Sequence, residues 1–235
     1  MGYGDKNSAG VPGKGRAFLL VLLFFGFGGL LSGQTESTAD SRTEPAIQQE
    51  QEHLRGMIQE EKLARDVYLT LHRQWGLQAF ENIARAESRH RQAVRNLLDR
   101  KGIDDPTSDD AIGVFVDQKF VDLYVRLTQK GSGSLVSALQ VGLEIEEMDI
   151  TDLRKAKAST TDPAILSVYE NLERGSRNHL RAFAGQLKAN GGTYAPTHLS
   201  PDDFASIESS PQEAGGPGNG QNGKGRGRRS RRGGS

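Results

Sequence analysis

The chain of 235 residues contains no cysteine. This absence excludes a disulfide scaffold, a zinc–thiolate site, a cysteine-ligated iron–sulfur cluster, a cysteine nucleophile and a lipoprotein anchor. Any metal must therefore be bound by histidine and carboxylate side chains. Apolar residues are also scarce, at 35% of the chain, so part of it must lie outside a packed core. No alternating strand pattern of useful length is present, which argues against a β-sheet.

The chain also lacks a net charge, because 30 basic residues balance 30 acidic ones. This balance is the sum of three unlike segments. Residues 1–33 hold three basic residues and one acidic residue, and residues 212–235 hold six and one. The segment between them therefore carries a net charge of −7. We expect this acidic segment to be the folded unit.

Residues 1–33 have the pattern of an export signal. Lys14 and Arg16 precede an apolar run over residues 17–31, and small polar residues follow it. A helix of this run would be about 22 Å long, shorter than the roughly 30 Å hydrocarbon layer, which favours a cleaved signal peptide. Because no strong A-x-A cleavage site is present, an uncleaved membrane anchor is the alternative. We expect an exported protein, periplasmic or extracellular, in which residues 34–43 form a linker.

Residues 209–235 are rich in glycine and arginine and have almost no apolar side chains. This composition predicts a disordered basic tail. The stretch GKGRGRRSRRGG resembles Gly-Arg segments that contact nucleic-acid phosphates. Export would separate it from cytoplasmic nucleic acid, and no aromatic residue is interleaved. We therefore expect the tail to touch anionic lipid or an envelope polymer instead.

The central residues 44–208 are predicted to form an all-α domain. Helical patterns cover about 43–76, 78–100, 117–129, 134–155 and 162–191, and an irregular strap with a last short turn of helix follows. The short connections make an antiparallel hairpin of each pair of long helices. More than thirty residues, including the short helix, join the two hairpins. One long crossover between two hairpins is the ferritin-like arrangement of a four-helix bundle.

Each long helix interrupts its inward apolar seam near mid-length. The residues at these positions are Glu61, Glu87, His90, Glu146, Asp149, Ser176 and His179. One carboxylate or histidine on a seam is usually a snorkelling or hydrogen-bonded side chain. Four carboxylates and two histidines buried together without a cation would each carry a desolvation penalty of several kcal/mol. The combination therefore predicts a metal centre.

Several sequence blocks resemble a known family. The blocks EEKLARDVY, FENIARAESRH, LQVGLEIEEMDITDL, VYENLERGSRNHLRAF and GGTYAPTHLS occur in this order. They are similar to the bacterial and archaeal ferritin-like proteins known as domain of unknown function 2202, over residues 54–207. The first block also resembles rubrerythrin, because Glu61 is followed by Ala64, Arg65 and Tyr68 at the spacings found there.

The resemblance implies a di-iron or di-manganese carboxylate site. The positions that match its ligands are Glu61, Glu87, His90, Glu146, Asp149 and His179. Ser176 departs from the pattern, because a glutamate is expected three residues before the ligand His179. This departure leaves open whether one ion or two bind. Glu144 or Glu147 could replace the missing carboxylate, since both neighbour the inward stripe, but we expect each of them on a solvated face.

The ligand types indicate the chemistry. Oxygen and nitrogen ligands without thiolate suit iron or manganese, with zinc as a redox-silent competitor. We expect two iron ions that react with O2 or peroxide, in an oxidase, peroxidase or ferroxidase-like reaction. The inward Tyr68 and Tyr169 and nearby Trp75 either relay electrons or simply fill the core. The alternative, motivated by Ser176, is a metal-storage module or a metal-free interaction module of the cell envelope, without catalysis.

Overall fold

The structure, a computed structural model, describes residues 43–214. The predicted export segment, almost all of the predicted linker, and the basic tail beyond residue 214 lie outside this range. Within it the chain is all-α, as predicted, with six helices and no strand. The helices are α1 Glu44–Trp75, α2 Gln78–Lys101, α3 Gln118–Gly131, α4 Leu135–Ala158, α5 Pro163–Ala189 and α6 Pro201–Ser209. None of these six helices combines the length and the apolar character needed to cross a membrane.

Local sequence explains where the long helices begin and end. Gly76 and Gly102 adopt left-handed conformations with φ of 65° directly after α1 and α2, a conformation that glycine adopts without steric cost. The Asp162 side chain accepts hydrogen bonds from the first backbone amides of α5, where Pro163 occupies the first turn. An N-cap aspartate followed by proline is a common start of a helix.

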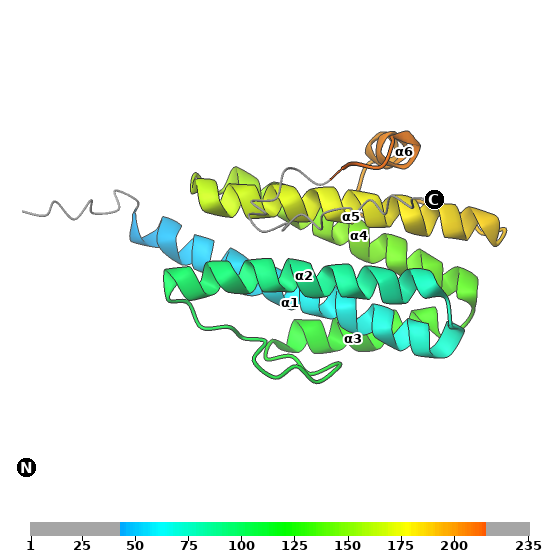
Figure 1. Cartoon of the computed structure of the whole chain (residues 1–235), viewed down its shortest axis with the longest axis horizontal. Coiled ribbons are helices and arrows are strands. Elements are labelled where there is room, and N and C mark those ends of the chain that lie inside the picture. Colours follow the sequence, from blue (N-terminus) through cyan, green and yellow to red (C-terminus); the bar gives the residue numbers. More distant parts are fainter. Residues whose placement is uncertain (1–42, 215–235) are drawn as a thin grey trace, which may run out of the picture. The chain divides into compact units, whose positions relative to one another are not determined.

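The long helices are arranged as two hairpins (Figure 1). Helix α1 packs on α2 and α4 packs on α5, and the hairpins meet through the pairs α2 with α5 and α1 with α4. Helix α3, in the connection between the hairpins, packs on α1 and α4, while α6 packs on α5. This arrangement brings the middle of all four long helices to one place.

Two clusters of buried apolar side chains fill the space between these helices. One contains Tyr68, Phe80 and Phe183 and lies toward the end where α1 turns into α2. The other contains Leu54, Leu97 and other aliphatic side chains toward the opposite end. In α1, α2 and α5 the polar positions singled out in the sequence lie between the residues of the two clusters, whereas in α4 Glu146 and Asp149 lie beside residues of the first cluster. The candidate site is therefore a polar layer flanked by the two apolar clusters.

A buried ion pair fastens the loop before α3 to α1. Lys62 and Asp66 are both 0% exposed, and their charged groups are 2.7 Å apart. The Lys62 ammonium also donates to the carbonyl of Ala111, and the Asp66 carboxylate accepts from the amide of Gly113. These bonds hold a segment with little regular structure against the first hairpin.

The segment after α5 is held by two carboxylates. One Glu147 oxygen accepts the backbone amides of Thr197, His198 and Leu199 at 2.6–2.9 Å. Beyond α6, which is a nine-residue helix rather than a single short turn, Glu213 pairs with Arg177 and Arg181 of α5. These contacts continue to residue 213, past the predicted end of the domain at residue 208.

Candidate metal centre

Glu87 of α2 lies between the two histidines of the polar layer. Its Oε2 is 2.7 Å from Nδ1 of His90, one turn along the same helix. Its Oε1 is 2.7 Å from Nδ1 of His179, which comes from α5. The two imidazole rings stack with centroids 5.5 Å apart. One carboxylate thus faces two ring nitrogens, each through a different oxygen.

A second carboxylate accompanies each histidine. Glu61 Oε2 of α1 lies 3.4 Å from Nδ1 of His90, and Glu146 Oε2 of α4 lies 3.5 Å from Nδ1 of His179. The result is two groups of potential metal ligands, Glu61 with Glu87 and His90, and Glu87 with Glu146 and His179. Within each group the ligand atoms lie within 4.8 Å of one another. Glu87 is the member common to both.

Several oxygens of this cluster are buried without a hydrogen bond to any residue in the part of the chain that the structure describes. Both carboxylate oxygens of Glu61 are in this position, as are Oε1 of Glu87 and Oε2 of Glu146. The great majority of buried polar atoms in proteins form at least one hydrogen bond, so each exception needs a reason. A cation held by these oxygens and by the two histidines would satisfy them all. The donor set therefore fits a metal centre.

The pKa values of these groups are shifted in opposite directions. Burial raises the pKa of Glu61 to about 8, although the charge of His90 opposes this. Burial also acts to raise the pKa of Glu87, but the charges of His179 and His90 hold it well below its ordinary value. Burial acts to lower the pKa of His179, but the charges of Glu87 and Glu146 outweigh this effect and raise the pKa to about 10. Strongly shifted neighbouring groups are typical of functional sites.

Two residues outside the ligand set position its members. The Tyr68 hydroxyl donates a 2.6 Å hydrogen bond to Oε1 of Glu146, and its ring packs among Phe80 and Phe183. Gly175 of α5 faces the ring of His90, and a Cβ at this position would overlap ring atoms Cε1 and Nε2. The first contact orients a carboxylate, and the second leaves room for a histidine.

Asp149 and Ser176 lie in the polar layer but in neither group. Asp149 is 3% exposed, and its Oδ2 is buried without a hydrogen bond within residues 43–214. Burial, together with the charges of Glu61 and Glu146, raises its pKa well above the ordinary value. Ser176 is fully buried, and its hydroxyl donates to the carbonyl of Leu172 in its own helix. The structure thus brings together five of the six predicted ligands, with Asp149 beside them.

Two neighbours of Glu146 are buried, contrary to the prediction from the sequence. Glu144 and Glu147 were expected on a solvated face, but both are buried, at 6% and 0% exposed. Glu144 pairs with Arg126 and Lys130, whereas Glu147 holds the segment after α5. Their partners come from distant parts of the chain, which periodicity along one helix does not detect.

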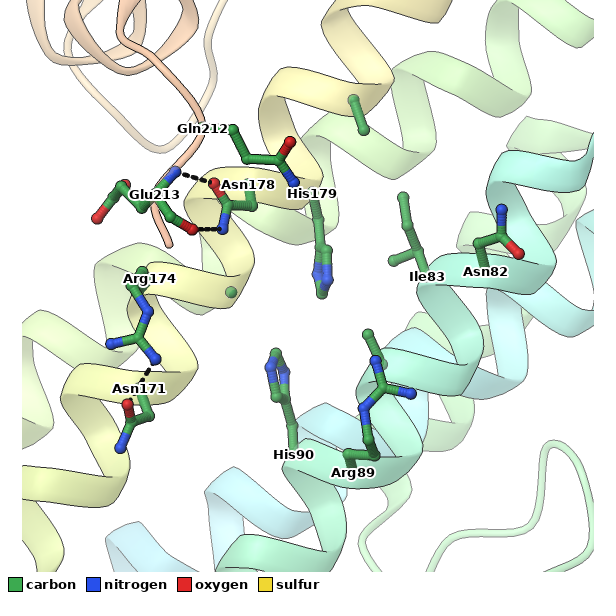
Figure 2. A pocket seen from close by; sticks show the side chains of 13 residues that line it. Asn82, Ile83, Arg89, His90, Asn171, Arg174, Asn178, His179, Gln212 and Glu213 are labelled. Atoms are coloured by element: carbon green, nitrogen blue, oxygen red, sulfur yellow. Dashed lines mark hydrogen bonds between the residues drawn. The ribbon is translucent and has the colours of Figure 1, made fainter. Parts of the chain in front are cut away.

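A cavity of about 530 Å³ opens above the histidines between α2 and α5. Figure 2 shows His90 and His179 reaching toward each other from the two helices at its base. The side chains of these histidines are 16% and 11% exposed, whereas Glu87 is fully buried. A small molecule can therefore approach the cluster on its histidine side.

The fold and the cluster define a class: an all-helical protein with paired carboxylate–histidine groups able to hold metal ions in its interior. Residues 50–211 match the family described as an uncharacterized protein domain, DUF2202. Because the match covers well over half of the chain, the protein belongs to this family, as its sequence blocks predicted.

A relative from an archaeon supports the assignment. The chain is 48% identical to the uncharacterized protein MJ0754 of Methanocaldococcus jannaschii over 172 residues, which are 73% of this chain and 93% of that protein. It is also similar to the crystal structure of hypothetical protein MJ0754 from Methanococcus jannaschii DSM 2661, with a TM-score of 0.70 and 47% identity. That match covers 74% of this chain and 100% of the other.

Proposed function

We propose that this protein is a ferritin-like four-helix protein that binds two metal ions, preferably iron, and carries out redox chemistry with O2 or peroxide. The observation that carries the proposal is the shared Glu87, with a histidine and a further carboxylate on each side. The ferritin-like description is supported by two helical hairpins joined through one long crossover. The absence of thiolate and the carboxylate-rich set favour iron or manganese over softer metals.

Each residue of the cluster has a role in this proposal. Glu87 would be shared by the two ions, Glu61 and His90 would hold one, and Glu146 and His179 would hold the other. Tyr68 orients Glu146 through its hydroxyl. When bound, iron would supply electron exchange with the oxidant. The chain itself supplies exclusion of water, through the apolar clusters on both sides of the layer, and an approach through the cavity at the histidines.

Metal analysis of the purified full-length protein tests this proposal. We expect close to two ions per chain in the wild type, loss of both in Glu87→Ala, and loss of one in His179→Ala. His198→Ala is the matched control, because His198 is exposed and lies outside both ligand groups. Wild-type protein without stoichiometric iron, manganese or zinc would contradict the proposal.

A second candidate is metal storage without turnover. The observation that favours it is Ser176, which leaves the two groups with a single shared carboxylate. Adding peroxide or a reductant to the iron-loaded protein separates the two functions. A redox-active centre changes its iron absorption on both additions, whereas a storage site does not respond to peroxide. A stable protein that never takes up metal would favour an interaction module instead.

A further inference from the structure

The cavity between α2 and α5 has a lining that the metal ligands do not explain. Besides His90 and His179, it is lined by Arg89 from α2 and Arg174 from α5. Figure 2 shows these two arginines on opposite sides of the opening. The volume of about 530 Å³ falls in the range of small-molecule sites in proteins.

Neither arginine is paired with an acid of the described residues. Within residues 43–214, Arg89 donates to the carbonyl of Arg85, and Arg174 donates to the side-chain oxygen of Asn171. No ion pair to a carboxylate is present for either of them in this part of the chain. Five of the six other arginines of the same two helices do have such partners, namely Arg85, Arg91, Arg95, Arg177 and Arg181; the sixth is the exposed Arg100 at the end of α2. The cavity therefore holds two positive charges available to a ligand.

The acid in the lining, Glu213, does not cancel these charges. Its carboxylate is bound by Arg177 and Arg181, which hold its pKa down to about 2. Its backbone amide and carbonyl are both bonded to the side chain of Asn178, as Figure 2 shows. Glu213 is thus held in place at the edge of the cavity, and Arg177 and Arg181 neutralise its negative charge.

The rest of the lining is mixed. The amide side chain of Asn82 also lines the cavity, beside those of Asn171 and Asn178, which are already bonded within the protein. The small apolar surfaces of Ile83 and Ala182 lie nearby. The fork of an arginine matches the two oxygens of a carboxylate. A carbon chain would contact the apolar residues. The lining therefore fits a molecule with one acidic group and a short apolar body.

We propose that this cavity binds a small organic carboxylate, held by Arg89 and Arg174 with its carbon chain over His90 and His179. The proposal rests on the proposed function, since it names the class of organic substrate that would be presented to the centre. Binding by the arginines itself requires no metal. The two ideas can therefore be tested apart.

The test is an NMR titration of the full-length protein, metal-free and zinc-loaded, with butyrate and with its neutral counterpart butyramide. Side-chain signals of Arg89, Arg174 and the three asparagines report where the probe binds. We expect saturable shifts with butyrate, with a Kd on the order of 1–10 mM. Butyramide should bind roughly tenfold more weakly, because it lacks the charge.

Charge-removing variants complete the test. Arg89→Gln with Arg174→Gln should raise the Kd for butyrate at least about tenfold. Arg73→Gln with Arg100→Gln is the matched control, since both residues are exposed on α1 and α2 and lie outside the cavity; its Kd should stay at the wild-type value. Equal binding of butyrate and butyramide, equal binding by the Arg89/Arg174 variant, or no saturable shift would each overturn the proposal. Butyrate binding by a protein that takes up no metal would refute only the proposed function.

Discussion

Gly175 of α5 lies against the imidazole of His90 of α2, so close that no Cβ fits between them. The two residues come from different hairpins, and the absence of one side chain creates the space for the other. A helix interior normally disfavours glycine by about 1 kcal/mol relative to alanine. The position of the His90 ring explains why a glycine is tolerated here.

Gly175→Ala should therefore displace His90 toward the open cavity. We expect the affinity of the Glu61–Glu87–His90 group for metal to fall at least tenfold, about 1.4 kcal/mol, with little loss of thermal stability. Gly185→Ala on the same helix is the control, because a Cβ there meets no atom within 4 Å. It should raise stability by about 0.5–1 kcal/mol without changing metal uptake. Unchanged metal affinity in Gly175→Ala would refute this role.

Glu61→Gln should stabilise the metal-free protein at neutral pH. The pKa of Glu61 is raised to about 8 in the folded protein, mainly by burial, from 4.5. The unfolded chain therefore releases a proton between pH 4.5 and 8 that the folded chain keeps, which lowers stability progressively over this window. We expect Gln to add about 1–3 kcal/mol at pH 7.5 and little at pH 4.

Urea unfolding in a chelator at both pH values measures this effect. Glu52→Gln is the matched control, because Glu52 is an exposed glutamate of the same helix, and it should change stability by less than about 0.5 kcal/mol. A gain of equal size at pH 4 and pH 7.5 would show that burial of the acid is not the cause.

Asp66→Asn should strongly destabilise the fold. The substitution leaves the ammonium of Lys62 buried without its charged partner. Such a change typically lowers the free energy of unfolding by about 3–5 kcal/mol. Asp152→Asn breaks the pair with Lys155, which has a similar distance of 2.8 Å but side chains 70% and 41% exposed. That control should cost at most about 1 kcal/mol. Chemical denaturation compares the two variants, and equal losses would contradict the importance of burial.

Limited proteolysis adds a local readout for the same pair. Because Lys62 and Asp66 hold Ala111 and Gly113, the Asp66→Asn variant should be cut first between α2 and α3. Cleavage elsewhere at the same rate would argue against an anchoring role for this pair.

Glu213→Gln should loosen the segment after α6. The arginines that bind Glu213 lower its pKa from 4.5 to about 2, so its contribution is complete above pH 4.5 and disappears as the pH falls through 2. Hydrogen exchange of residues 210–213 should be faster in the variant at pH 7 and pH 5. The difference should shrink toward pH 2. Glu208→Gln, at an exposed site of α6, should exchange like the wild type at every pH.

The sequence predicted the helices because their signals are local. Gly76, Gly102 and the Asp162–Pro163 pair act within one turn of the helix ends that they define. The polar layer was also predictable, since Glu87 and His90 interrupt a regular apolar spacing. Each residue advances an α-helix by about 1.5 Å. The number of residues between a ligand and the turn at the end of its helix therefore predicts how far along the bundle that ligand lies.

The remaining features depend on partners that are distant in the chain. Lys62 reads as a surface residue of α1, yet Ala111, which binds it, lies 49 residues away. Asp149 shares the inward stripe of Glu146, but spacing alone does not reveal that its oxygens lie outside the two ligand groups. The space beside Gly175 is set by how α2 and α5 approach each other. Such contacts are fixed by tertiary packing rather than by pattern.

The contact between α2 and α5 gives the cluster a mechanical role. His90 and His179 belong to different hairpins, and Glu87 lies against both. An ion shared by these residues would act as a cross-link between the two hairpins, in addition to the apolar clusters that both hairpins share. Cross-links of this kind restrict the unfolded chain most when they close long loops. Metal loading would then make it harder for the α1–α2 hairpin to separate from the α4–α5 hairpin.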